Sequence, residues 1–128
     1  LTSLAKCKDE LLSNIVSKDE LSKIASQTMV GGATLTKLLG TSAWYAPGAS
    51  VSYLVNAIVN DTKEILPCSV YLTGEYNVED ICIGVPSIIG RNGFEVVVEF
   101  DLDSKELEMF NNSVKAVKQT NLALDGLI

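Results

Sequence analysis

The stretches of sequence that decide the fold read LPCSVYLTGEY at residues 66–76 and ICIGVPSIIGRNGFEVVVEF at residues 81–100. In each of them apolar side chains recur at every second position, as Val70 and Leu72 do in the first and Ile83 does with its neighbours in the second. This period of two is typical of β-strands that bury one face. The second half of the chain is therefore expected to be built around a sheet.

Short turn signals divide these stretches into three strands. Gly74-Glu75-Tyr76-Asn77 reads as the first turn and Gly90-Arg91-Asn92-Gly93 as a hairpin turn. After the hairpin turn a third strand is indicated, with the alternating apolar residues Phe94, Val96, Val98 and Phe100. Three successive strands joined by short turns predict an antiparallel sheet with one face buried. Pro86 interrupts the second strand, which suggests an edge or a bulge at that point.

Helices are predicted before and after the strands along the chain, where they would pack on the sheet, and the N-terminal third is predicted to be helical. Ser17 and Glu20 have the spacing of a capping box, and an apolar stripe of helical period runs from Leu21 to Leu39. Gly31-Gly32 lies within that stripe. Two interpretations are open for the glycine pair, either a break between two helices or the close approach of another backbone.

Two further helices follow. Residues 40–48 form a predicted loop, and Pro47 fits the first turn of the next helix. That helix has an apolar stripe made of Val51, Leu54, Val55, Ile58 and Val59. After the sheet, Asp103 and Glu106 indicate the start of a last helix, whose stripe is Leu107, Phe110, Val114, Val117 and Leu124. Helices, then strands, then a helix make the predicted class α+β.

Composition excludes several kinds of function. The chain has 128 residues and a mass of 13.7 kDa, which by length is one domain. Its net charge of −6 argues against nucleic acid as a partner, and no apolar run reaches membrane-span length. It contains no histidine, so a His base, a Ser-His-Asp triad and a His-ligated metal are impossible within this sequence. Arg91 is the one arginine that could clamp a carboxylate.

The three cysteines, Cys7, Cys68 and Cys82, are odd in number and widely spaced. They match neither a disulfide framework nor a metal site, so reduced structural thiols are expected, which points to a cytoplasmic location. The first residues lack the basic and apolar regions of a signal peptide. They also lack an initiator methionine, as in a processed chain or a fragment.

Other candidate groups each have a simpler interpretation. The GxxG pattern at residues 90–93 has the form of a phosphate clamp, but flanking strands favour a plain hairpin turn. Trp44 and Tyr45 could stack on a ligand, although core or interface positions are commoner for aromatic side chains. The acidic groups Asp101, Asp103 and Glu106, and Glu75, Glu79 and Asp80, are better explained by helix capping and a solvated loop. No metal site is predicted.

Several segments, taken in order, resemble a known family. They are GGA at residues 31–33, GTSAWYAPGAS at 40–50, LPCSVYLTGEY at 66–76, IGVP at 83–86 and IGRNG at 89–93. They are similar to GGAEIV…GSAYYAPAAS and LPCAAYLEGEYG…VGVPVVLGRNG in the C-terminal domain of the lactate-dehydrogenase-like branch of malate dehydrogenases. The resemblance runs from about Ile15 to Leu124, with mild departures at Thr41 and Trp44.

The resemblance implies the C-terminal substrate domain of an NAD-dependent oxidoreductase of the tricarboxylic acid cycle, which converts malate to oxaloacetate with hydride transfer to NAD. In that family an N-terminal Rossmann domain binds NAD, and the substrate-binding arginines and the catalytic His with its Asp lie upstream of the matched region. No catalytic residue is therefore expected in this chain, which alone would be inactive. Carried over by position, Ala43 would face the substrate, and Pro47 would line the pocket on the nicotinamide side.

The resemblance also implies partners. The helix of residues 47–60 would contribute to the subunit interface of a homodimer or homotetramer, and the chain would pack on its own Rossmann domain. Two alternatives are open. One is the corresponding domain of a lactate dehydrogenase on a malate-dehydrogenase scaffold. The other is a stand-alone, non-enzymatic interaction module that binds through Trp44, Tyr45 and the apolar stripe of that helix.

Overall fold

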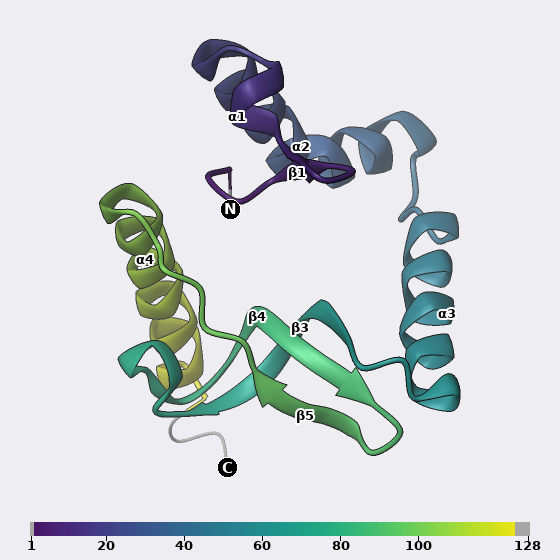
Figure 1. Cartoon of the computed structure of the whole chain (residues 1–128), viewed down its shortest axis with the longest axis vertical. Helices are drawn as coiled ribbons and strands as arrows, with labels where there is room; N and C mark the ends of the chain where they lie inside the picture. Colours follow the sequence, from purple (N-terminus) through teal and green to yellow (C-terminus); the bar gives the residue numbers. More distant parts are fainter. Residues whose placement is uncertain (1, 125–128) are drawn as a thin grey trace. The chain divides into compact units, whose positions relative to one another are not determined.

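The structure is a computed structural model that describes residues 2–124. It divides into two compact units, Leu1–Ala49 and Ser50–Ile128, and each is described by itself. The first unit contains a two-stranded antiparallel ribbon of β1 (Lys6–Cys7) and β2 (Glu10–Leu11). The short helix α1 (Leu12–Ile15) and the long helix α2 (Lys18–Leu39) follow (Figure 1). The ribbon contradicts the prediction that the N-terminal third is helical, and neither the ribbon nor α1 has a periodic sequence signal.

Helix α2 is continuous through the glycine pair. The predicted capping box is confirmed, since the Ser17 side chain accepts from the Glu20 N–H and the Glu20 carboxylate accepts from the Ser17 N–H. Gly31 and Gly32 do not break the helix, and no atom lies within 4 Å of a Cβ built at either position. The described residues therefore support neither a break nor a close backbone approach. The helix ends at Gly40, whose φ of 69° suits glycine.

Helix α3 (Tyr45–Asn60) begins two residues before the predicted Pro47 and continues into the second unit. The sheet of that unit has the order β3-β4-β5 and is antiparallel throughout. Its strands are β3 (Glu64–Thr73), β4 (Glu79–Gly90) and β5 (Gly93–Val97). A short 3-10 turn, η1 (Glu75–Asn77), joins β3 to β4, and α4 (Ser104–Leu122) follows the sheet. The predicted α+β class is confirmed.

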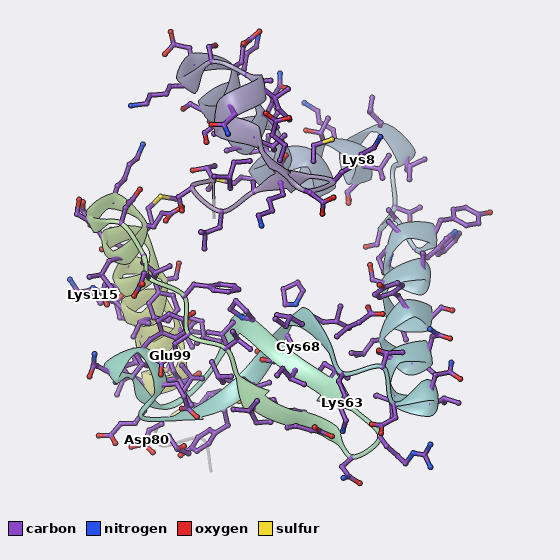
Figure 2. All side chains as sticks on the ribbon, viewed as in Figure 1. Lys8, Lys63, Cys68, Asp80, Glu99 and Lys115 are labelled. Atoms are coloured by element: carbon purple, nitrogen blue, oxygen red, sulfur yellow. The ribbon has the colours of Figure 1, made fainter. Side chains whose placement is uncertain are left out.

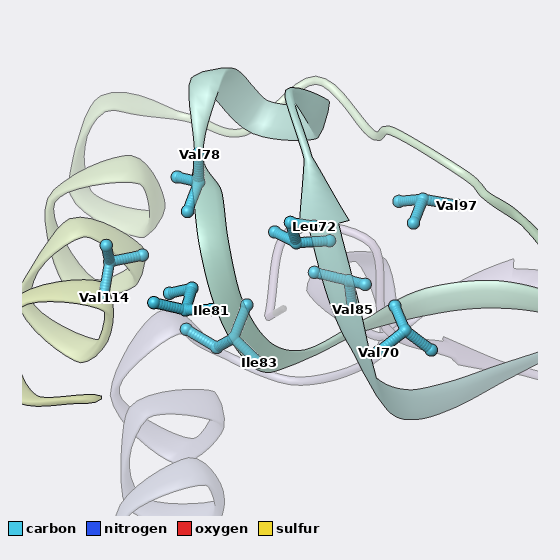
Figure 3. Packing of buried hydrophobic residues seen from close by; sticks show 8 residues of the cluster. All are labelled: Val70, Leu72, Val78, Ile81, Ile83, Val85, Val97 and Val114. Carbon is cyan, nitrogen blue, oxygen red and sulfur yellow. The ribbon is translucent and has the colours of Figure 1, made fainter. Parts of the chain in front are cut away.

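The core of the second unit lies between one face of the sheet and α4. Leu72 is fully buried, and Val114 of α4 packs into the same cluster, with Phe110 and Val117 partly buried against it. Figure 3 shows this packing; its labelled residues are Val70, Leu72, Val78, Ile81, Ile83, Val85, Val97 and Val114. Leu107 and Leu124, predicted in the same helical stripe, are 44% and 53% exposed and lie outside the core.

In the third strand, β5, the buried face is not the one that carries the alternating apolar residues. Val97 pairs with Ser87 and is buried, whereas Phe94 and Val96 are 43% and 49% exposed. The register shift between Ile88 and Ile89 is a bulge, and opposite residues in paired strands share one face of the sheet. Val97 therefore shares the core face with Ser87. The predicted apolar face with Phe94 and Val96 is therefore not the buried one, and the strand ends at Val97, before the predicted Val98 and Phe100.

Pro86 lies in the central strand, not at an edge, and it pairs with Pro67 of β3. Its carbonyl accepts a hydrogen bond from the Val98 N–H (2.8 Å), so its main-chain polar groups face the β5 side. A proline has no N–H to return to the Val98 carbonyl. The Tyr76 hydroxyl donates to that carbonyl instead (3.1 Å) and accepts from the Phe100 N–H (2.9 Å). A side chain thus replaces the missing ladder bond.

Candidate functional site

The loop between α2 and α3 is the candidate site. The non-helical part is shorter than predicted, because the Gly48 N–H already donates to the Trp44 carbonyl (2.8 Å) in the first turn of α3. Ala43 is half-buried, and Pro47 is exposed in that first turn, where its missing N–H costs nothing. The loop therefore presents a small side chain and a proline.

Trp44 and Tyr45 are not core residues of this chain. Trp44 is 67% exposed and Tyr45 is 88% exposed. Aromatic side chains usually bury a large apolar area, so this exposure is typical of a surface that another element covers. Of the interpretations given to these residues, burial in the core of this chain is wrong.

The predicted stripe of α3 is also largely uncovered within the described residues. Val51, Val55 and Val59 are 59%, 49% and 66% exposed, whereas Leu54 and Ile58 are half-buried. Ala57 is the buried residue of the helix. The Tyr53 hydroxyl donates to the Glu64 carboxylate, and this hydrogen bond raises the pKa of Tyr53. Val51, Val55 and Val59 form an apolar face that is largely exposed among the described residues, which we call the α3 face.

The acidic groups act locally. Asp103 and Glu106 form the capping box of α4, as predicted. The Glu75 carboxylate accepts from the Thr73 N–H (2.7 Å), and main-chain N–H donors lower the pKa of Glu75. The Tyr71 hydroxyl donates to Asp80 (2.7 Å), which raises the pKa of Tyr71. Across residues 2–124, no group of acidic or cysteine side chains could hold a metal ion.

The predicted hairpin turn at residues 90–93 is confirmed, because Gly90 pairs with Gly93 between β4 and β5. A charged cluster that sequence reasoning missed holds this turn. Asp61 accepts from the Arg91 N–H (2.7 Å) and contacts Lys63 (2.9 Å), and Lys63 also pairs with Glu95. We call Asp61, Lys63 and Glu95 the hairpin cluster.

Contacts in and around the hairpin cluster shift the pKa values of Asp61 and Lys63. The Arg91 N–H and Lys63 lower the pKa of Asp61, and the carboxylates of Glu95 and Asp61 raise the pKa of Lys63. Asp61 and Lys63 both have positive φ, 53° and 56°. Because Asp61 is 30 positions from Arg91 and Lys63 is 32 positions from Glu95, no local sequence motif indicates the cluster. Arg91 is exposed and its main chain, not its guanidinium, makes the hydrogen bond to Asp61.

All three cysteines are free. Among the described residues no pair of cysteines forms a disulfide. Cys7 and Cys82 are exposed and Cys68 is half-buried, so the expectation of structural, buried thiols is wrong for the first two. In β4, Cys82 lies on the face opposite to Ile81 and Ile83, which explains its exposure.

Comparison with known proteins identifies the fold and its family. The family model for the lactate/malate dehydrogenase alpha/beta C-terminal domain matches residues 4–122. The chain belongs to the lactate/malate dehydrogenase family. Residues 31–50 and 66–93, which carried the resemblance, lie within the matched part.

Individual members of the lactate/malate dehydrogenase family are close in sequence and structure. Malate dehydrogenase from Bacteroides thetaiotaomicron is 56% identical over 124 residues, which are 97% of this chain and 40% of that protein. The structure of Cryptosporidium parvum malate dehydrogenase superposes with a TM-score of 0.93 at 37% identity and covers 98% of this chain and 42% of its own. Lactate dehydrogenase from the same organism gives 0.91 at 29% identity, covering 98% and 41%. The chain thus spans about 40% of the length of these relatives.

The two sheets of the described residues differ from the sheet of a dinucleotide-binding fold. The two sheets are antiparallel throughout, whereas a dinucleotide-binding fold needs a glycine-rich turn between a strand and a helix of a parallel sheet. No helix among the described residues is long and apolar enough to cross a membrane.

Proposed function

We propose that this chain is the substrate-domain part of an NAD-dependent malate dehydrogenase, which oxidises malate to oxaloacetate. The observation that carries the proposal is the family match over residues 4–122, together with 56% identity to a malate dehydrogenase. The exposed α3 face and the exposed Trp44 and Tyr45 support it, because a domain that works inside a larger protein leaves such surfaces for other elements to cover.

In this proposal the chain supplies a wall of the substrate pocket. Ala43 faces the substrate, where its small side chain leaves room for the second carboxylate of malate, and Pro47 lines the nicotinamide side. NAD accepts the hydride, and it is bound mainly by a Rossmann domain outside this chain. The base for the hydroxyl proton and the cations for the carboxylates also come from outside, because the sequence has no histidine and its single arginine lies in the hairpin turn.

The partners follow from the same proposal. The α3 face packs in a homodimer or homotetramer of the whole protein, and the chain packs on its own Rossmann domain. The cytoplasm is the proposed location, because three free cysteines, two of them exposed, suit a reducing compartment. Nucleic acid is not a partner, which accords with the net charge of −6.

A chimera tests the proposal. The matching 40% of the Bacteroides thetaiotaomicron malate dehydrogenase is replaced by this chain, and the rates with oxaloacetate and pyruvate are compared using NADH. We expect oxaloacetate to be reduced with a kcat/KM far above that for pyruvate. The intact relative is the positive control. A folded chimera that turns over neither substrate would contradict the proposal.

A second candidate is a lactate dehydrogenase, because the TM-score of 0.91 to a lactate dehydrogenase is close to the 0.93 to a malate dehydrogenase. In the chimera, the part taken from the Bacteroides thetaiotaomicron enzyme contributes to substrate choice. The preference between pyruvate and oxaloacetate must therefore be measured on the native protein that contains this chain. A kcat/KM for pyruvate above that for oxaloacetate in that protein would select this candidate.

A stand-alone interaction module is the third candidate, and the exposure of Trp44 and Tyr45 favours it. The mass of the native protein in a lysate of its source decides this point. A two-domain protein of ~300 residues supports the enzyme, and a native species of 13.7 kDa supports the module.

A further inference from the structure

The tip of the β4–β5 hairpin carries a pair of residues with its own reactivity. Asn92 is followed by Gly93, and no other asparagine in the sequence precedes a glycine. Asn92 is exposed in the two-residue turn. Gly93 has a φ of 86°, and no atom lies within 4 Å of the place where its Cβ would be. The main-chain nitrogen of Gly93 is therefore sterically free to approach the Asn92 side chain once the turn opens.

We propose that Asn92 is a site of spontaneous deamidation, and that the hairpin cluster controls its rate. The Gly93 nitrogen gives up its proton to hydroxide and bonds to Cγ of Asn92. The bond from Cγ to Nδ2 breaks, and ammonia leaves. Water then opens the cyclic imide at either carbonyl, which yields aspartate or isoaspartate. Each event converts a neutral amide into a carboxylate and makes the net charge of −6 more negative by one.

The folded turn opposes this reaction. Gly93 pairs with Gly90 at the end of the ladder, so its main chain is held in the hairpin. Arg91 and Asn92 lack the positive φ seen in type I′ turns, and Gly93 alone is left-handed, as in a type I turn followed by a bulge. In such a turn ψ of the second central residue is near 0°, which keeps the Gly93 nitrogen away from Cγ. Ring closure therefore requires local opening of the turn.

Asp61 holds the turn closed. Its carboxylate accepts from the Arg91 N–H (2.7 Å), directly before Asn92, and contacts Lys63 (2.9 Å). Lys63 in turn pairs with Glu95 on β5, so the cluster joins the end of α3 to both sides of the hairpin tip. Figure 2 shows Lys63 beside this hairpin. Exposed tips open at low free-energy cost, and a charge-assisted hydrogen bond is the contact that raises that cost.

The first experiment follows the whole 128-residue chain by peptide mapping during incubation at mildly alkaline pH. We expect acid to accumulate at Asn92 severalfold faster than at any other asparagine, with both aspartate and isoaspartate present. Asn77 is the internal control, because it is also exposed and in a tight turn but precedes Val78. Equal rates at Asn92 and Asn77 would overturn the proposal.

The second experiment tests the control by the cluster. Asp61→Asn turns the charged hydrogen bond into a neutral one and removes the ion pair to Lys63, and asparagine tolerates the φ of 53°. We expect deamidation at Asn92 to accelerate severalfold. Asp80→Asn is the matched control, because Asp80 has a φ of 63° and also accepts a hydrogen bond, but its partner is Tyr71, and it lies at the far end of the sheet from Lys63 (Figure 2).

Both variants change the net charge by the same amount, so a general charge effect would change the deamidation rate at Asn92 equally in the two. Acceleration in Asp61→Asn alone supports control by the cluster. Equal rates in the two variants would overturn it. A fully unfolded sample of the original chain sets the upper limit of the rate, and a folded chain that reacts as fast as the unfolded one would also contradict the role of the turn.

Discussion

Tyr76 connects three segments of the second unit through a single side chain. Its hydroxyl bridges the Val98 carbonyl and the Phe100 N–H, and its ring lies 5.2 Å from that of Phe110 on α4. Its N–H also donates to Glu99 (2.7 Å). The residue has a φ of 53°, which is uncommon for a bulky side chain. These contacts compensate for a backbone conformation that tyrosine does not favour.

We expect Tyr76→Phe to destabilise the chain by about 1–3 kcal/mol, because it leaves the Val98 carbonyl without the donor that Pro86 cannot supply. Urea unfolding measures this difference. Tyr71→Phe is the matched control, since its hydroxyl bonds to Asp80 at the surface, and its effect should stay within about 0.5 kcal/mol. Equal losses in the two variants would contradict the proposed bridging role.

Ala43 is the residue on which the proposed substrate pocket depends. In the active chimera, Ala43→Leu should lower kcat/KM for oxaloacetate by about 10-fold to 100-fold, because a larger side chain moves the substrate from its reactive geometry. Ala116→Leu, at an exposed position of α4, is the control and should leave kcat/KM unchanged. If Ala43→Leu also leaves it unchanged, Ala43 does not line the pocket.

At the scale of elements, the start of α2 depends on one ionised side chain. The Ser17 side chain and the Ser17 N–H both donate to Glu20, and these hydrogen bonds lower the pKa of Glu20 below its ordinary value of 4.5. A carboxylate whose pKa is lowered in the folded state stabilises that state at pH values above the carboxylate's ordinary pKa. The contribution is lost as the pH falls through the folded pKa.

We therefore expect Glu20→Gln to lower the stability of α2 at neutral pH, with the difference from the original chain shrinking as the pH falls below 4.5. Amide exchange in the first turn of α2 is the readout, because it reports opening of that helix end. Asp19→Asn removes a neighbouring charge and leaves the capping box intact. A difference that is constant with pH would show that ionisation of Glu20 plays no part.

The α3 face provides a second prediction at this scale. Because Val55 and Val59 are exposed in this chain, Val55→Glu should not unfold it, and the melting temperature should change by less than about 2 °C. In the chimera the same change should shift the assembly toward monomer, measured by sedimentation. Ser52→Glu, on the polar side of α3, is the control. An unchanged assembly in Val55→Glu would exclude this face from the subunit interface.

The elements themselves were largely predictable, because their signals are local. The capping boxes at Ser17 and Asp103 and the hairpin turn at residues 90–93 each depend on residues a few positions apart, and all are confirmed. The buried face of β5 was not predictable from the apolar pattern, since Phe94 and Val96 make the more apolar face and yet the register with β4 places Val97 on the core face. The hairpin cluster connects Asp61 to Arg91 and Lys63 to Glu95, across 30 and 32 positions, which no local pattern encodes.

At the scale of the whole molecule, the chain has the fold of the C-terminal domain of the lactate/malate dehydrogenase family, and its sequence contains no histidine. The position of Ala43 in the loop, that of Pro47 in the first turn of α3, and the class of the fold could be predicted from the sequence. The roles of these two residues came only through the resemblance, because small side chains and prolines have no chemistry that marks a site. Exposure of Trp44 could not be read from the sequence either, since burial depends on what covers a residue.

We expect the purified 128-residue chain to show no malate or lactate dehydrogenase turnover at any NAD concentration. The sequence has no histidine to act as base, and its antiparallel sheets offer no glycine-rich dinucleotide turn. A coupled absorbance assay of mass-verified material is the measurement, with the chimera as the positive control. Reduction of oxaloacetate by the chain alone would show that the chemistry resides in these residues.

The pairing of Pro67 with Pro86 has a consequence for how the isolated chain behaves at high concentration. Because the polar main-chain groups of Pro86 face β5, those of Pro67 face away from β4, at the outer side of β3. A proline there offers no donor to an incoming strand, so templated growth of an extended sheet stalls at this position. Because Pro67 has no main-chain N–H, the outer side of β3 opposes the addition of further strands and so fibril formation from the chain.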